Sequence, residues 1–174
     1  KRHDALLIAN TLEQLDFDVM LDTNVATIGE FSDIVRDFGR KREQYDVGFI
    51  YYAGHGIQVK SENFLLPTKE TFESIYDVQD NGLSVQKIMR YLTGMSDQVN
   101  ILILDACRDN PFEPTWKATR SLKGGGLAKI PPPTGSLIAF STDAGQTAAD
   151  GDGENSVYST SLARNMLLEN TSLD

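Results

Sequence analysis

Two short segments contain residues that could act together in nucleophilic catalysis. The first is Ala53-Gly54-His55-Gly56 and the second is Asp105-Ala106-Cys107-Arg108-Asp109, and each follows an apolar run. Cys107 is the only cysteine of the chain and His55 is one of two histidines. A thiol with its free pKa of about 8.5 is mostly protonated at neutral pH, and a neighbouring imidazole can accept that proton. The pair therefore predicts a cysteine–histidine catalytic dyad.

Both residues can also be explained without catalysis, because a lone cysteine is often a small buried apolar side chain and a lone histidine is often structural. Their surroundings favour the catalytic interpretation. Gly54 and Gly56 leave space beside the imidazole. The backbone N–H groups of Gly56 and Cys107 would form an oxyanion hole, where each donor typically contributes roughly 3–4 kcal/mol in the transition state.

The elements that position these residues follow from the periodicity of apolar side chains. Helical spacing predicts helices over residues 4–16, 28–38, 85–92 and 159–168. Short apolar runs predict strands at 17–21, 47–53, 101–104 and 137–140, with a hairpin over 57–66. This alternation predicts an α/β fold with a largely parallel central sheet flanked by helices. Functional groups gather at the carboxyl ends of such strands, so His55 and Cys107 converge if their strands are neighbours.

Composition excludes several classes of protein. A chain of 174 residues suits one domain with a sizeable core. The net charge of −9 argues against partners such as nucleic acid or an anionic membrane surface. One cysteine excludes an internal disulfide, and no run approaches the roughly 20 apolar residues of a membrane span. With no signal peptide visible, we expect a cytoplasmic location.

The two segments resemble motifs of the caspase-like cysteine peptidases. Tyr51-Tyr52-Ala53-Gly54-His55-Gly56 resembles the histidine motif and residues 100–112 resemble the cysteine motif. Within this clan the chain is most similar to bacterial caspase homologues and metacaspases, often called orthocaspases. Phe64-Leu65-Leu66-Pro67 and residues 139–151 extend the resemblance over nearly the whole chain. It implies the caspase–hemoglobinase fold and a cysteine endopeptidase with His55 and Cys107 as the dyad.

The resemblance also bears on the substrate. Caspases that cleave after aspartate have glutamine two positions before the cysteine, and Asp105 stands there in this chain. In metacaspases this aspartate and one in an Asp-Ala step, matched by Asp4-Ala5, line the primary specificity (S1) pocket. Two carboxylates would attract arginine, or less readily lysine. A helix N-cap is the alternative role of Asp4.

Two further carboxylates lie in the loop after the last predicted strand. Asp143 and Asp150 could border the same cleft, although solvated loop carboxylates are the alternative. The resemblance implies no cofactor for the chemistry. Many metacaspases need calcium, but Asp77 and Asp80 are the only nearby acidic pair after His55, and calcium takes six to eight oxygen ligands. We therefore expect no calcium dependence.

The resemblance divides a single peptidase domain, 1–174, into a large-subunit-like part at about 1–112, a linker at 113–135 and a small-subunit-like part at 136–174. The linker carries basic residues at which an enzyme of this preference could cut itself: Lys117, Arg120, Lys123 and Lys129. Family members begin with a strand before the helix at Asp4, so we expect such a segment upstream and associated with this domain. Caspases dimerise through the sheet edge whereas metacaspases stay monomeric, and the sequence leaves the oligomeric state open.

The expected partners are protein or peptide substrates with basic residues. Two alternatives stay open at this point. One is a catalytically silent caspase-like scaffold or regulatory module, and the other is a cysteine hydrolase or acyltransferase acting on non-peptide substrates. The intact His55 and Cys107 argue against the first, and Asp105 favours a cationic peptide over the second.

Overall fold

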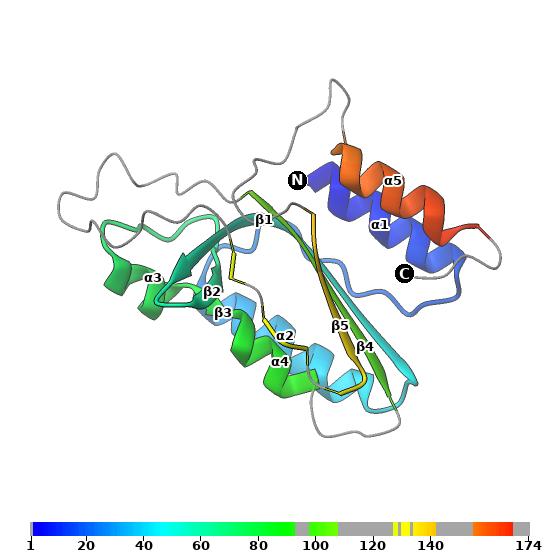
Figure 1. Ribbon diagram of the computed structural model, residues 1–174, viewed down its shortest axis with the longest axis horizontal. Helices are drawn as coiled ribbons and strands as arrows, with labels where there is room; N and C mark the ends of the chain where they lie inside the picture. The colour runs from blue at the N-terminus through cyan, green and yellow to red at the C-terminus, as the bar shows by residue number, and fades with distance from the viewer. Residues whose placement is uncertain are drawn as a thin grey trace.

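A computed structural model of the chain describes residues 2–92, 98–107, 127–128, 130–132, 134–141 and 155–168 (Figure 1). The described helices are α1 (Arg2–Gln14), α2 (Ile28–Arg42), α3 (Ile75–Asn81), α4 (Val85–Leu92) and α5 (Val157–Met166). The described strands are β1 (Val47–Val59), β2 (Glu62–Leu65), β3 (Leu83–Ser84), β4 (Val99–Cys107) and β5 (Ser136–Phe140).

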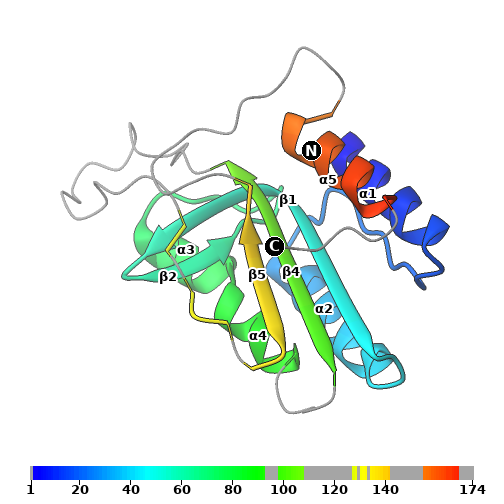
Figure 2. The ribbon, with the colours of Figure 1, turned by 45° about the vertical axis from the view of Figure 1, so that its right-hand side comes forward.

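The strands form one mixed sheet in the order β3-β2-β1-β4-β5. Strands β1, β4 and β5 are parallel, whereas β1, β2 and β3 pair in antiparallel fashion. Helices α1 and α5 lie on one side of the parallel strands, and α2 and α4 lie on the other (Figures 1 and 2). The predicted α/β fold is confirmed, and its parallel part consists of the strands that carry the two motifs.

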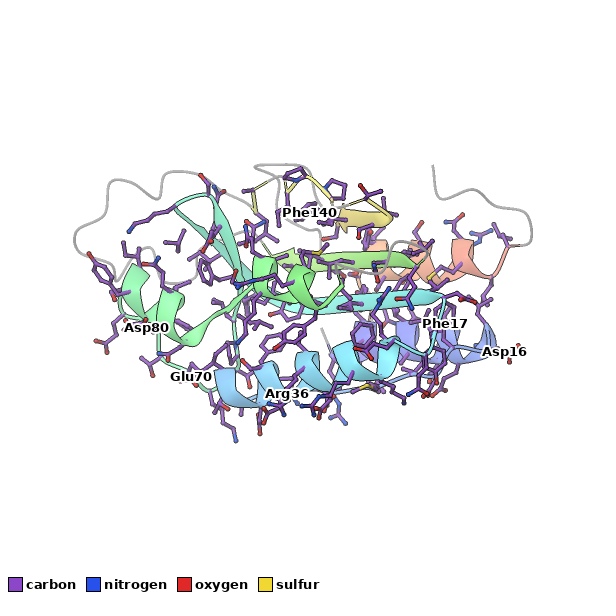
Figure 3. The ribbon with its side chains drawn as sticks, turned by 90° about the horizontal axis from the view of Figure 1, so that it is seen from below. Asp16, Phe17, Arg36, Glu70, Asp80 and Phe140 are labelled. Carbon is purple, nitrogen blue, oxygen red and sulfur yellow. The ribbon has the colours of Figure 1, made fainter. Side chains whose placement is uncertain are left out.

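The alternation of side chains along the parallel strands divides the core between the two helical layers. Leu102 and Leu104 of β4 are each 1% exposed and pack in the main cluster with residues of α2 and α4. Phe49 and Tyr51 of β1 pack in a smaller cluster with α1 and α5. Figure 3 shows side chains filling the space between α2 and the sheet, with Asp80 at the outer surface. Each face of the sheet therefore has its own helical cover.

The hairpin predicted after the histidine is confirmed. Strand β1 pairs with β2 from Gly56 opposite Leu65 to Val59 opposite Glu62. The two turn residues, Lys60 and Ser61, have φ angles of 49° and 68°. Positive φ at both central positions is the geometry that matches the twist of the flanking strands in a two-residue hairpin.

The start of α2 was also predictable from the sequence. The Thr27 hydroxyl accepts a hydrogen bond from the Glu30 N–H over 3.3 Å. The Glu30 carboxylate reaches back and accepts one from the Ala26 N–H over 2.7 Å. These reciprocal bonds satisfy backbone donors that a helix N-terminus otherwise leaves without partners.

Two sequence predictions need correction, and one helix was not predicted. Residues 17–21 do not form a strand, because no described strand lies beside them to complete a ladder of hydrogen bonds. Strand β1 continues past Ala53 to Val59, so His55 lies inside the strand and not in a loop after it. Helix α3 was not predicted, although Ser74 caps it by accepting the Asp77 N–H. Only Val78 of α3 is buried, which leaves too few apolar positions to define a period.

Candidate active site

The parallel pairing of β1 and β4 brings the two motifs together. In this register Ala53 lies opposite Asp105, and His55 lies opposite Cys107, the last residue of β4. Adjacent strands of a sheet are about 4.8 Å apart. The main chains of the predicted base and the predicted nucleophile are therefore neighbours where the parallel pairing ends: β4 stops at Cys107, and β1 continues from Gly56 into its pairing with β2. A functional site is expected at this edge of an α/β sheet.

The backbone of His55 is held from two directions. The Tyr52 hydroxyl donates to the His55 carbonyl over 2.8 Å, and the Leu66 N–H donates to the same oxygen over 3.0 Å. This arrangement requires a glycine at position 54, because a Cβ there would collide with the Tyr52 hydroxyl and ring. Gly54 thus lets the phenol cross the strand and fix the carbonyl of the next residue.

Gly56 is needed for a different reason. A Cβ at this position would lie 3.1 Å from Leu127 Cδ2 and 3.2 Å from Ala106 Cβ. Leu127 is 3% exposed, and the residue after it is held by a fully buried asparagine. The Asn63 amide donates to the Ala128 carbonyl over 2.8 Å, and its oxygen accepts the Ala128 N–H over 2.6 Å. Both bonds fasten residues 127–128 against the strand that carries His55.

Asp105 is fully buried, and its two oxygens have different surroundings. Oδ2 accepts hydrogen bonds from the Tyr51 hydroxyl over 2.8 Å and from the Ser156 hydroxyl over 3.0 Å. Oδ1 is buried and has no hydrogen-bond partner within the part of the chain that the structure describes. A buried carboxylate oxygen without a donor is costly and uncommon in proteins, so this atom calls for an explanation.

Asp4 joins the same group of residues from the other end of the chain. Its Oδ1 accepts the Ser156 N–H over 2.6 Å and the Ser159 hydroxyl over 2.7 Å. The Ser156 and Ser159 hydroxyl oxygens lie 2.9 Å apart, and the Ser159 N–H donates to the Ser156 hydroxyl over 3.0 Å. Two serines therefore connect the two carboxylates assigned to the S1 pocket. We call Asp4, Tyr51, Asp105, Ser156 and Ser159 the carboxylate network.

The ends of two helices contribute to this electrostatic environment. Asp4 lies in the first turn of α1, and Ser156 is the N-cap of α5. Positive helix N-termini stabilise nearby negative charge. Burial opposes ionisation of Asp4, but hydrogen bonds from the Ser159 hydroxyl and the Ser156 N–H outweigh this effect and hold its pKa below the ordinary value. Asp4 is the third residue of α1 and not its N-cap, and its carboxylate bonds to the start of α5.

The tyrosines near Asp105 remain neutral donors over the usual pH range. Burial raises the pKa of Tyr51 most, and the charge of Asp105 together with the hydrogen bond to it raises that pKa further. Burial and the charge of Asp105 also raise the pKa of Tyr158. Asp105 is thus surrounded by phenols that can donate a proton in a hydrogen bond but do not add negative charge.

Sequence reasoning missed three members of the network: Tyr51, Ser156 and Ser159. The Ser-x-x-Ser spacing before an apolar helical run is an N-cap signal, and it could have placed the start of α5 at Val157. Nothing local indicates that the same serines reach residues 4 and 105. The remaining assigned residues, Asp143 and Asp150 and the basic linker residues Lys117, Arg120, Lys123 and Lys129, lie outside the described residues.

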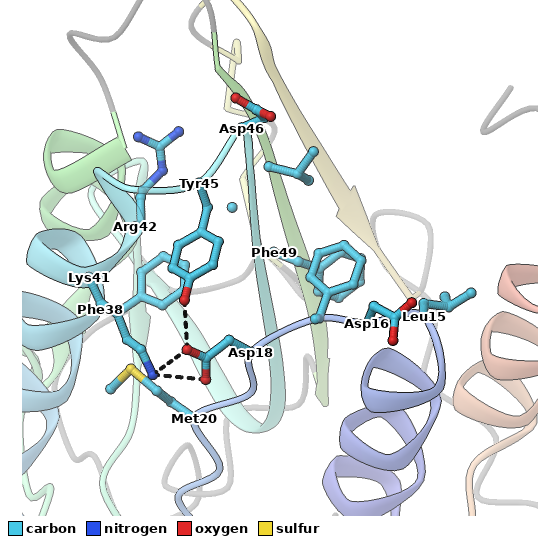
Figure 4. A pocket seen from close by; sticks show the side chains of 13 residues that line it. Leu15, Asp16, Asp18, Met20, Phe38, Lys41, Arg42, Tyr45, Asp46 and Phe49 are labelled. Atoms are coloured by element: carbon cyan, nitrogen blue, oxygen red, sulfur yellow. Dashed lines mark hydrogen bonds and ion pairs between the residues drawn. The ribbon is translucent and has the colours of Figure 1, made fainter.

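A cavity of about 260 Å³ lies elsewhere, at the beginning of β1 (Figure 4). It is lined by residues 15–18, Met20 and the strand start at 47–49, and it contains none of the predicted site residues. In its wall the Asp18 carboxylate pairs with Lys41 over 2.8 Å and accepts a hydrogen bond from the Tyr45 hydroxyl over 2.7 Å. Eight residues of β1 separate Val47 from His55, or about 26 Å of strand, so this cavity is not part of the dyad site.

Among the described residues, no group of three or more histidine, cysteine, aspartate or glutamate side chains could hold a metal ion. In the same part of the chain, no helix combines the length and the apolar character that crossing a bilayer requires.

Comparison with known proteins decides the family. The model of the caspase domain, within the C14 peptidases, matches residues 1–174. The chain belongs to the caspase family.

Two curated relatives of this caspase-family chain come from mammals. They are the human mucosa-associated lymphoid tissue lymphoma translocation protein 1 and its mouse homologue. Each is 29% identical over 123 residues, which is 69% of this chain and 14% of the relative. The match therefore concerns one part of much longer proteins.

Asn63 provides a first test of how this caspase-family site is built. We expect Asn63→Ala to lower the free energy of unfolding by about 2–3 kcal/mol, because two hydrogen bonds are lost and a backbone N–H is left without its partner. The backbone amide of Ala128 should also exchange with deuterium faster. Urea unfolding and hydrogen exchange measure the two effects. Asn10→Ala, at an exposed position of α1, is the matched control. Unchanged exchange at Ala128 in Asn63→Ala would contradict the role of Asn63 in holding residues 127–128.

The lowered pKa of Asp4 predicts that the stability of the folded protein depends on pH. Because its folded pKa is lowered, the ionised carboxylate stabilises the protein above the unfolded pKa of about 3.9, and this contribution disappears as the pH falls through the folded pKa. Asp4→Asn should therefore be about 1–3 kcal/mol less stable than the wild type at pH 7. The difference should shrink below pH 4. Urea unfolding of both proteins across this range measures it, and parallel stability curves would refute the prediction.

Proposed function

We propose that this chain is the peptidase domain of a cysteine endopeptidase that cleaves after arginine and, less efficiently, after lysine. Cys107 is the nucleophile and His55 is the general base and acid. The proposal places the chain with the metacaspase and orthocaspase type within the caspase family, with protein or peptide substrates that carry basic residues. The observation that supports it most strongly is the register of β1 and β4, in which His55 lies opposite Cys107.

The proposed reaction has two halves. His55 accepts the thiol proton as Cys107 Sγ bonds to the scissile carbonyl carbon, and the carbonyl oxygen becomes an oxyanion held by the N–H groups of Gly56 and Cys107. The C–N bond then breaks, and His55 gives the proton to the leaving amine. In the second half water attacks the thioester, His55 takes a proton from that water, and the thiol is restored as the carboxylic acid leaves.

The proposed specificity for a cation is supported by the carboxylate network. Asp105 lies two residues before the nucleophile, and its Oδ1 has no hydrogen-bond donor among the described residues. The donors on Oδ2 are neutral hydroxyls, so the charge of Asp105 is not balanced by them. A guanidinium or ammonium group would supply both the missing donor and the opposite charge. Because Asp105 is fully buried, groups that cover it must move when the substrate enters.

A set of fluorogenic peptides that differ only in the residue before the cut tests the function. We expect the full chain to cleave after arginine, then lysine, and not after aspartate, and Cys107→Ala to be inactive. Asp105→Ala should reduce kcat/KM for the arginine peptide roughly 100-fold, within the range expected when one partner of a buried charge pair is lost. The readouts are initial rates and circular dichroism to confirm folding.

Asp46→Ala is the matched control, because it removes the same charge at an exposed position just before β1. It should leave kcat/KM unchanged. Cleavage after aspartate but not arginine would refute the assigned pocket. Absence of cleavage with every peptide would favour the alternative of a catalytically silent scaffold.

The same specificity predicts self-cleavage in the linker at residues 113–135. Lys117, Arg120, Lys123 and Lys129 are the candidate cleavage sites. Intact-mass analysis of the wild type should show two fragments whose masses identify the cut, whereas Cys107→Ala should remain a single chain. If both proteins show the same single-chain mass, the linker is not a substrate.

A further inference from the structure

The way Asp105 is held suggests roles for residues that no motif assigns. A carboxylate has about four lone-pair sites, two on each oxygen. The Tyr51 and Ser156 hydroxyls occupy Oδ2, which leaves this oxygen fully used, while Oδ1 is left without a donor. The network therefore directs both of its donors to one oxygen and keeps the other available.

We propose that Tyr51 and Ser156 are positioning residues for recognition of the basic side chain: their hydroxyls fix Asp105 through Oδ2 so that Oδ1 meets the substrate cation. This inference rests on the proposed function, because it concerns the same pocket. The proposal also predicts how the substrate guanidinium approaches Asp105. An arginine cannot pair side-on with both oxygens of Asp105 when Oδ2 is occupied, so its guanidinium approaches Oδ1 alone.

The protons available in the network support this division of roles. Each serine hydroxyl has a single proton. Ser159 is within 2.7 Å of Asp4, and Ser156 is within 3.0 Å of Asp105, so one proton serves each carboxylate. Tyr51 supplies the only other described donor to Asp105. Neither the two serines nor Tyr51 has a second hydroxyl proton for Oδ1, and Tyr158, the other phenol near Asp105, makes no hydrogen bond to this oxygen.

The scaffold behind these hydroxyls is rigid enough to orient them. Tyr51 belongs to β1, where it lies opposite Ile103 in the parallel pairing with β4, and it packs against the cluster that α1 and α5 form on this face of the sheet. Ser156 is the N-cap of α5 and is 6% exposed. Tyr51 therefore holds Asp105 from within a strand, and Ser156 holds it from the residue that caps a helix; strands and helices position a side chain more accurately than loops do.

Tyr51→Phe is the main test, because it removes one oxygen atom and keeps the ring. If the hydroxyl positions Asp105, its loss lets the buried carboxylate turn to find other donors, and Oδ1 withdraws from the cation. We expect KM for the arginine and lysine peptides, and the inhibition constant of agmatine as a small guanidinium probe, to rise about tenfold while kcat changes less than threefold. The rate at which iodoacetamide alkylates Cys107 should stay unchanged. Tyr45→Phe is the matched control, because that hydroxyl also donates to an aspartate but at the far end of β1.

Ser156 is tested by a pair of variants. Ser156→Ala removes the donor to Asp105 together with the cap of α5, whereas Ser156→Thr keeps a hydroxyl at the same place. We expect the alanine variant to raise KM for the basic peptides and the inhibition constant of agmatine about tenfold. The threonine variant should restore both values. Ser74→Ala controls for the loss of a serine cap, because Ser74 caps α3 and also contacts a carboxylate, that of Asp77.

The outcomes separate this inference from the proposed function. If the wild type cleaves no basic peptide, the proposed function fails. If the wild type cleaves them and Tyr51→Phe leaves KM and agmatine inhibition unchanged, only the positioning role is refuted. A fall in KM, with a rise in the preference for arginine over lysine, would also refute it, since the hydroxyls would then compete with the cation for Oδ2.

Discussion

The parallel pairing of β1 with β4 is the constraint on which the candidate site depends. It aligns nine residue pairs, from Val47 opposite Val99 to His55 opposite Cys107. A shift of one residue would move every side chain of one strand to the other face of the sheet. The same register is required by the core, because Leu102 and Leu104 must meet α2 and α4. Packing of the apolar face of the sheet thus fixes the register in which His55 lies opposite Cys107.

Because alternate side chains of a strand point to opposite faces of the sheet, neighbouring residues of β1 and β4 have different roles. On β4, Leu102, Leu104 and Ala106 are buried in the main cluster, whereas Asp105 bonds to Tyr51 and to the first residues of α5. On β1, Tyr52 stacks on Phe31 with ring centroids 5.8 Å apart and holds the His55 carbonyl. Both faces of the sheet therefore have an apolar core, and the face toward α1 and α5 also carries the polar network.

The features that could be predicted are those that depend on short stretches of sequence. The capping box at Thr27, the hairpin after His55 and the apolar runs of β1 and β4 follow from short-range patterns, and these were enough to predict an α/β fold with both motifs at strand ends. Residues 17–21 show where such patterns fail, because an apolar run becomes a strand only beside a partner. The links from Ser156 to Asp4 and Asp105 span 152 and 51 residues, and no local period encodes them.

The network also departs from what stability alone would favour. A buried carboxylate is most stable when both oxygens have donors or when a cation lies beside it, and the described partners of Asp105 are two neutral hydroxyls on one oxygen. Proteins depart from full satisfaction of buried polar groups mainly where function requires it. A further serine would occupy Oδ1, and an internal lysine would also neutralise the carboxylate; either would stabilise the fold at the expense of the proposed site for a basic substrate. Under the proposed function, the unsatisfied oxygen is the cost in stability of keeping a cation site ready for a ligand from outside the chain.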